Sequence, residues 1–148
     1  MIVSDDWGCS VTESMTLTEP NPLVVDASND QVVYYGYTPM SCVDMDATVT
    51  GGCAEYDYIW SSAGAILSTT DNFADCPTSD AQYILEVQGQ NGCDSTDCVS
   101  VFVIDVIYYA GNSGSQKVEM CQDSPGNPAN AHTICMDESV VPAHSAIG

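Results

Sequence analysis

The sequence has almost no basic residues. Lys117 is the single Lys or Arg against 21 Asp and Glu, and the formal net charge is −20. A nucleic-acid-binding protein needs Lys and Arg to neutralise phosphates, so that class is excluded, and binding to an anionic membrane surface is excluded for the same reason. One cation cannot offset all the acids. They form a solvated, salt-screened coat or they bind Ca²⁺, and both interpretations stay open.

Long apolar runs are also absent. No run approaches the ~20 residues needed to cross a bilayer, so we expect no membrane insertion. The start of the sequence, MIVSDDWGC, has neither a basic segment nor an apolar core and does not resemble a signal peptide. If the protein is exported, we expect this sequence to be the mature form or a fragment. At 148 residues it can hold one domain with an appendage, or two very small domains.

Eight cysteines are a high and even number for this length. No C-x2-C pair occurs, and even the closest pair, Cys93 and Cys98, has the wrong spacing for zinc. Disulfides formed in an oxidising, extracellular compartment are the better interpretation. Eight cysteines allow roughly a hundred sets of pairings. Of these we expect Cys121 with Cys135, Cys42 with Cys98, and Cys53 with Cys93, which leaves Cys9 and Cys76.

Short segments of alternating apolar and polar residues predict β-strands along the whole chain. The first is a Thr-rich strand over residues 9–18, which Pro20 and Pro22 cut off because proline cannot donate to a strand ladder. Short strands with turn signals roughly every 8–12 residues indicate a two-sheet antiparallel sandwich, with Trp60 in its inner core. The further strands are expected at residues 23–25, 31–35, 43–49, 56–60, 65–69, 83–87 and 98–107.

The composition changes after residue 107, where Gly, Ser, Asn and Pro become frequent. This part is too short to hold a core of its own, so it is interpreted as a small Cys/His appendage. Its expected elements are a turn at 111–115, a strand at 117–121, a loop at 124–130 and a short helix at 138–144. The chain is therefore divided into an N-terminal strand and Pro-rich linker (1–22), a sandwich (23–107) and the appendage (108–148).

Part of the sandwich resembles a known family of repeats. Residues 56–60 (YDYIW), 82–87 (QYILEV) and 91–101 (NGCDSTDCVSV) resemble PKD-like, immunoglobulin-type repeats. In those repeats a Y-x-W strand, an alternating strand, a D/N-x-N-G-C turn and a T-x-T-V-x-V strand follow one another. Such repeats are common in surface proteins of the Bacteroidetes type, which type IX secretion often exports.

The C-terminal part resembles a motif that is attached to such repeats, V-x-V-C-H…N-T-I-C-V…V-P-A-H-L-A-H-G-D. Residues 116–121 (QKVEMC), 125–135 (PGNPANAHTIC) and 141–144 (VPAH) match it, but Gln122 replaces its first His and residues 145–148 replace L-A-H-G. The resemblance implies an all-β, immunoglobulin/PKD-like antiparallel β-sandwich with a small disulfide-stapled appendage. It also implies a non-catalytic part of an extracellular adhesin, fibre or large surface protein.

The sequence gives no set of catalytic residues. Its only histidines, His132 and His144, do not lie in a nucleophile-elbow sequence, and no acid lies in a distinctive glycosidase motif. We therefore expect that the protein is not an enzyme. The two histidines could bind Zn²⁺ or Cu²⁺ with Asp137. The alternative is that His132 packs in the Cys121–Cys135 loop while His144 belongs to the tail.

Calcium is the metal that the acidic composition favours. Three pairs of acids lie in expected turns, where backbone carbonyls are also free, but none matches an EF-hand loop. These pairs are Asp26 with Asp30, Asp71 with Asp75, and Asp94 with Asp97. Asp94 and Asp97, with Asp5 and Asp6, are the favoured candidate ligands.

Tyr34, Tyr35 and Tyr37 form an aromatic cluster around Gly36. Because Tyr is amphipathic and enriched at interfaces, the cluster could stack on sugars or contact another subunit. Core packing at an ordinary strand edge is the alternative.

The N-terminal strand leads to the main functional hypothesis. A detached strand can fill the open sheet edge of the next subunit, and repeating that contact head-to-tail gives a filament of identical copies. The strand could instead fold back onto its own domain. We therefore expect a structural subunit of an extracellular bacterial filament or surface layer. The alternative is a Ca²⁺-dependent carbohydrate-binding or adhesion module with glycan partners.

Overall fold

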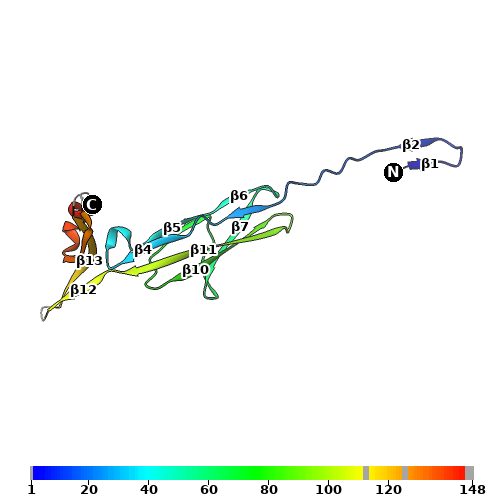
Figure 1. The fold of residues 1–148 in the computed structure, drawn as a ribbon. Coiled ribbons are helices and arrows are strands. Elements are labelled where there is room, and N and C mark those ends of the chain that lie inside the picture. The colour runs from blue at the N-terminus through cyan, green and yellow to red at the C-terminus, as the bar shows by residue number, and fades with distance from the viewer. Residues whose placement is uncertain (1, 112–113, 125–126, 146–148) are drawn as a thin grey trace.

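The computed structural model describes residues 2–111, 114–124 and 127–145. The molecule is elongated, with an N-terminal arm at one end, a β-sandwich in the middle and the C-terminal appendage at the other end (Figure 1). Within these residues, no helix is long and apolar enough to cross a membrane.

The larger layer of the sandwich is a five-stranded sheet in the order β4-β11-β10-β7-β8. Three buried side chains, Tyr83, Leu85 and Val87, alternate with exposed residues along its central strand, so the period-2 pattern places one face on the core. Neighbouring strands are antiparallel, as expected, except β4 and β11, which run parallel. The strands are β4 (Gln31–Tyr35), β7 (Tyr56–Ser62), β8 (Ala65–Ser68), β10 (Ala81–Gly89) and β11 (Asp94–Asp105).

The second layer consists of two short ladders. β3 (Val24–Asp26) pairs with β6 (Thr48–Thr50), and β5 (Val43–Asp46) pairs with β9 (Asn72–Asp75). The single strand expected at residues 43–49 is therefore wrong. The segment instead forms two strands, β5 and β6, with different partners. The chain passes from one to the other at Ala47, whose N–H donates to the Asp71 carbonyl at 2.9 Å.

The core lies between these two layers, as the all-β sandwich requires. Trp60 is fully buried at its centre, as predicted, and its ring lies 5.5 Å from that of Phe73. The Tyr83 ring also packs against Phe73, with the ring centres 6.2 Å apart, and the Tyr83 hydroxyl donates to the Asp75 carboxylate at 2.6 Å. The core thus joins β7 and β10 of the larger sheet to β9 of the smaller layer.

The appendage is a three-stranded antiparallel sheet followed by a short helical segment. Its strands are β12 (Ile107–Ala110), β13 (Ser115–Ser124) and β14 (Asn127–Met136), in that order across the sheet. The loop expected at 124–130 is wrong over most of its length, because β14 begins at Asn127 and pairs with β13. The helix expected at 138–144 is confirmed as the 3₁₀ turn η3 (Glu138–Val140) and α1 (Val141–Ser145).

One disulfide joins Cys42 to Cys76, so the expected pairing of Cys42 with Cys98 is wrong. In the β5–β9 ladder Val43 lies opposite Asp75, which places Cys42 and Cys76 side by side just beyond it. Cys98 instead lies on β11 opposite Ile84, on the exposed face of the larger sheet.

The other described cysteines are free thiols in this structure. Cys121 and Cys135 lie on neighbouring strands but in offset register, opposite Thr133 and Glu119 respectively, so the expected bond between them is not formed. Cys53 and Cys93 are not bonded either, although both lie beside Gly89. Cys9 is exposed in the N-terminal arm.

Candidate assembly interface

The arm begins with an exposed hairpin rather than the single strand expected at residues 9–18. β1 (Ile2–Ser4) pairs with β2 (Ser10–Thr12), and the strand ends there. The Asp5 carboxylate closes the turn by accepting hydrogen bonds from the N–H groups of Trp7 and Cys9, at 3.0 and 2.9 Å. A hairpin of two three-residue strands is only marginally stable in water by itself. Contacts with other protein surface would therefore increase the stability of this hairpin.

Residues 13–22 connect the hairpin to the sandwich in an extended conformation and belong to no strand (Figure 1). Met15 and Leu17 are 84% and 83% exposed, although both side chains are large and apolar. The five residues 14–18 contain no charge. Trp7, which sequence reasoning overlooked, is 92% exposed in the hairpin turn. The arm therefore offers apolar side chains that its own chain does not cover.

The root of the arm is fixed to the sandwich by backbone contacts. The Gly52 N–H donates to the Asn21 carbonyl at 2.7 Å. Gly51 has φ +76°, and a Cβ at this position would clash with the Pro22 carbonyl. The arm root and the loop at Gly51 therefore approach closely only because residue 51 is glycine. The arm therefore leaves the sandwich from a fixed point.

An apolar groove of about 470 Å³ lies where the sandwich meets the appendage, at the other end of the molecule. Tyr34 of β4 and Ile104 of β11 lie opposite each other in the sheet and form one wall, which Met40 of the 3₁₀ turn η1 (Thr38–Met40) extends. The buried side chains of Val118 and Val141 belong to the appendage wall. Among the described residues that line the groove, Glu119 alone is charged.

Hydrogen bonds between the two parts hold this groove in place. The Thr38 N–H donates to the Glu138 carboxylate at 2.7 Å, which joins η1 to η3. The Glu119 N–H donates to the Val106 carbonyl at 2.8 Å, which joins β13 to the end of the sandwich. The groove is therefore formed by segments that are far apart in the sequence but fixed relative to one another.

The tyrosine cluster proposed from the sequence divides between two surfaces. Tyr34 and Tyr37 line the apolar groove. Tyr35 lies on a separate, smaller hollow, which Tyr37 also borders. Two of the three tyrosines therefore belong to the surface that we interpret as an interface. Met40, Ile104 and Val141 belong to it too, but they carry no local sequence signal that would have identified them.

The acids proposed as calcium ligands do not come together. Asp5 and Asp6 lie in the arm hairpin, away from the sandwich (Figure 1). Asp94 and Asp97 are three residues apart on one strand and so face opposite sides of it. Asp97 faces inward, and its carboxylate accepts the Ala27 N–H at 2.8 Å.

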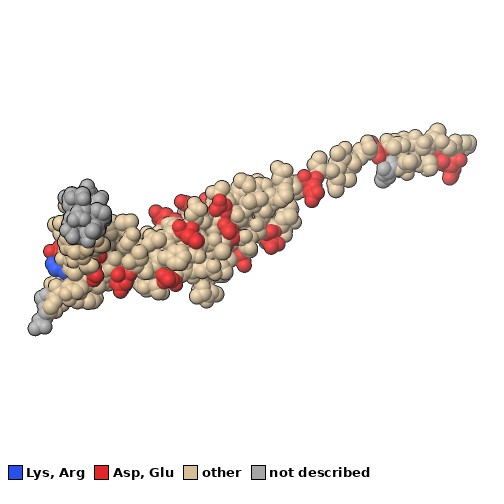
Figure 2. All heavy atoms as spheres, in the orientation of Figure 1, with Lys and Arg blue, Asp and Glu red and all other residues tan. Residues whose placement is uncertain are grey.

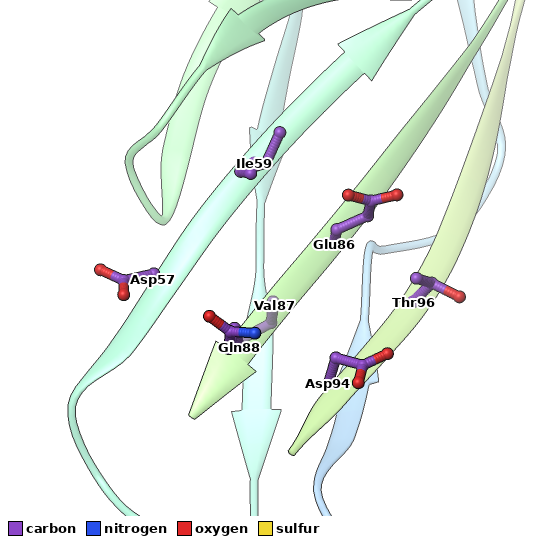
Figure 3. A pocket seen from close by; sticks show the side chains of 7 residues that line it. All are labelled: Asp57, Ile59, Glu86, Val87, Gln88, Asp94 and Thr96. Carbon is purple, nitrogen blue, oxygen red and sulfur yellow. The ribbon is translucent and has the colours of Figure 1, made fainter. Parts of the chain in front are cut away.

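Asp94 borders an acidic hollow of about 310 Å³ on the outer face of the larger sheet. Figure 3 shows its carboxylate with those of Asp57 and Glu86, on three neighbouring strands. Asp57 and Asp94 both lie opposite Gln88 in the sheet, one on each side, so an amide side chain stands between the two acids. The described residues contain no group of three or more His, Cys, Asp or Glu that could hold a metal ion.

Several other turn acids hold backbone N–H groups. Asp26 accepts the Ser28 N–H and Asp30 the Ser100 N–H, at 2.9 and 2.8 Å. Asp75 binds both Tyr83 and the Cys76 N–H. Asp71 contributes its backbone carbonyl rather than its carboxylate. On the face shown in Figure 2, the acids are spread along the sandwich rather than gathered at one place.

The two histidines lie near each other across Gln122. Gln122 is opposite His132 in the β13–β14 ladder, and its Nε2 is 3.3 Å from His144 Nδ1. Asp137, the proposed third ligand, instead forms an ion pair with Lys117 at 2.5 Å. The residues that replace L-A-H-G beyond position 145 lie outside the described part of the chain.

No family model and no curated protein matches this sequence.

Proposed function

We propose that this protein is a structural subunit of an extracellular bacterial filament or surface layer, in which copies assemble head-to-tail through the N-terminal arm. The observation that carries the proposal is the arm itself. It is anchored at its root, extends away from the sandwich and exposes Trp7, Met15 and Leu17. An apolar segment of this kind is stabilised when another molecule covers it.

The accessible surface supports the same conclusion. The chain exposes 10111 Å², whereas a compact monomer of this length exposes about 7,300 Å². The difference, roughly 2,800 Å², exceeds the ~1,600 Å² of a standard protein–protein interface. A head-to-tail contact would use the arm of one copy and the far end of the next. Such a heterologous contact does not close on itself and so grows into a filament.

The net charge of −20 sets a condition for assembly. Copies with this charge repel one another, and salt screens that repulsion. Raising NaCl from about 0.15 M to 0.5 M should therefore lower the protein concentration at which polymers form. Sedimentation velocity measures this concentration directly, and negative-stain microscopy shows the form of the polymers.

Deletion of residues 1–20 tests the proposal. The deletion keeps Asn21, which anchors the arm root, and all core residues, so a folded monomer should remain while polymers are lost. Far-ultraviolet circular dichroism checks the fold of the deleted chain. Polymers that persist without the arm, or a full-length chain that stays monomeric at every salt concentration, would refute the proposal. A monomer that binds glycans only with Ca²⁺ would support the adhesion alternative instead.

A further inference from the structure

We propose that the apolar groove between sandwich and appendage is the acceptor for the arm of a second copy, and that residues 14–18 are the segment it receives. This inference rests on the proposed function and adds the identity of the two contacting surfaces. The groove is lined by residues of β4, β11 and β13 where the sandwich meets the appendage. The arm lies at the opposite end of the molecule from the appendage, as a head-to-tail contact requires (Figure 1).

The two surfaces match in charge. The chain carries 21 acids, yet residues 14–18 contain none and Glu119 is the only charged residue among the described groove residues. An acidic residue flanks this segment on each side, Glu13 before it and Glu19 after it. Within the extended stretch 13–22, residues 14–18 are therefore the part that can enter an apolar groove without burying a carboxylate, which would be costly.

The two surfaces also match in shape. In an extended segment, Met15 and Leu17 point to one side and Thr16 and Thr18 to the other. The segment can thus present two apolar side chains to the groove while its threonines face water. Ten extended residues between the hairpin and the sandwich span about 33 Å, which lets the segment reach a neighbouring copy without disturbing its own root.

The surroundings of the groove favour an extended occupant. Its wall includes β4, the terminal strand of the five-stranded sheet, and an extended chain can lie along such a strand. The apolar surface also continues beyond the groove, because Val32 and Phe102 lie opposite each other on the outer face and both are about half exposed. The hairpin with Trp7 could cover part of this surface when residues 14–18 are bound.

Variants of the arm test the orientation. Met15→Asp with Leu17→Asp should weaken assembly strongly, by about 10- to 100-fold for each of the two substitutions, because each apolar side chain loses its burial. Thr16→Asp with Thr18→Asp is the matched control. It adds the same two charges to the same segment but leaves the apolar side intact, so it should weaken assembly much less. Equal effects of the two double variants would show that charge alone is responsible and would overturn the assigned orientation.

A complementation experiment tests the groove. The full-length double variant Met40→Asp with Ile104→Asp changes two groove residues that are 49% and 46% exposed, so folding should tolerate it. This variant should be monomeric, but its intact arm should bind the intact groove of the chain that lacks residues 1–20. Sedimentation velocity of the mixture should show a complex of one copy of each. Ile66→Asp, on the strand at the opposite edge of the sheet, is the control and should polymerise normally.

The outcomes separate the two proposals. If the arm deletion abolishes polymers but the groove variant still forms them, the arm functions in assembly and the groove is not its acceptor. Two monomeric variants that do not combine on mixing would likewise overturn the groove assignment. Full-length chains that never polymerise would overturn the proposed function itself.

Discussion

Removal of the Cys42–Cys76 disulfide gives the most direct test of the fold. The bond closes a loop with a sequence separation of 34 residues. In the chain-entropy model, losing a cross-link of this length costs about 3.8 kcal/mol of the free energy of unfolding at 25 °C. Both cysteines are exposed, so replacing them with Ser removes little packing. The measured change should therefore report mainly the lost constraint on the unfolded chain.

Urea denaturation of the double variant Cys42→Ser with Cys76→Ser measures this cost. With a slope of about 2 kcal/mol per molar urea, the midpoint should fall by about 2 M. Cys98→Ser is the control, because Cys98 is exposed and forms no disulfide, and it should change the free energy of unfolding by less than about 0.5 kcal/mol. The arm-deleted chain is the suitable background, since assembly would otherwise contribute to stability.

Two results would refute the reasoning. A loss below about 1 kcal/mol would mean that the bond does not constrain the unfolded chain as its loop length requires. A reducing agent should lower the stability of the parent chain to that of the double variant and leave the variant unchanged. If it destabilises the variant by a similar amount, another disulfide carries the effect.

Two further predictions concern the core and the loops at the arm root. Burial, followed by the hydrogen bond to Asp75 and the charge of Asp75, raises the pKa of the Tyr83 hydroxyl above its ordinary value of 10.0. Because the folded state holds this proton more tightly, its contribution to stability is complete below pH 10 and is lost as the pH rises above it. Tyr83→Phe should lower the free energy of unfolding by about 1–2 kcal/mol at pH 7 and flatten the loss of stability above pH 10 in urea titrations. Tyr109→Phe, at an exposed position, is the control and should change the free energy of unfolding at pH 7 by less than about 0.5 kcal/mol. Cys53 and Cys93 should form a disulfide under oxidised glutathione, because both lie close to Gly89. The Gly89 N–H donates to the Cys93 carbonyl at 2.8 Å, and a Cβ on Gly89 would lie 3.2 Å from the Cys53 carbonyl oxygen. Non-reducing peptide mapping should find the linked peptides, and alkylation of both thiols after oxidation would contradict this prediction.

Local patterns predicted most of the larger sheet. The alternation at residues 83–87 placed one face of β10 in the core, and the Trp60 prediction is confirmed by its complete burial. The N-G-C turn that the resemblance implied is also present at Gly92, with φ +78° and a hydrogen bond from its N–H to the Gly89 carbonyl. These features depend on residues close together in the sequence, so their pattern was sufficient to identify them.

Local patterns failed where a strand depends on its partner. The alternation over residues 9–18 is clear, yet only Ser10–Thr12 is a strand, because β1 provides a ladder for those residues alone. Conversely, the composition of residues 124–130 indicated a loop, but pairing with β13 makes most of it the edge strand β14, where proline is tolerated. Strand boundaries follow from cross-strand hydrogen bonds as well as propensity.

The amino-acid sequence by itself determined the fold class, the acidic surface and the uncharged character of residues 14–18, because composition and period-2 alternation are local properties. Only the tertiary structure decided which cysteine bonds to Cys42 and where the groove lies. The partner of Cys42 depends on the register between β5 and β9, and the groove combines β4, β11 and the appendage. Both result from contacts between distant segments, and packing of the whole chain determines those contacts.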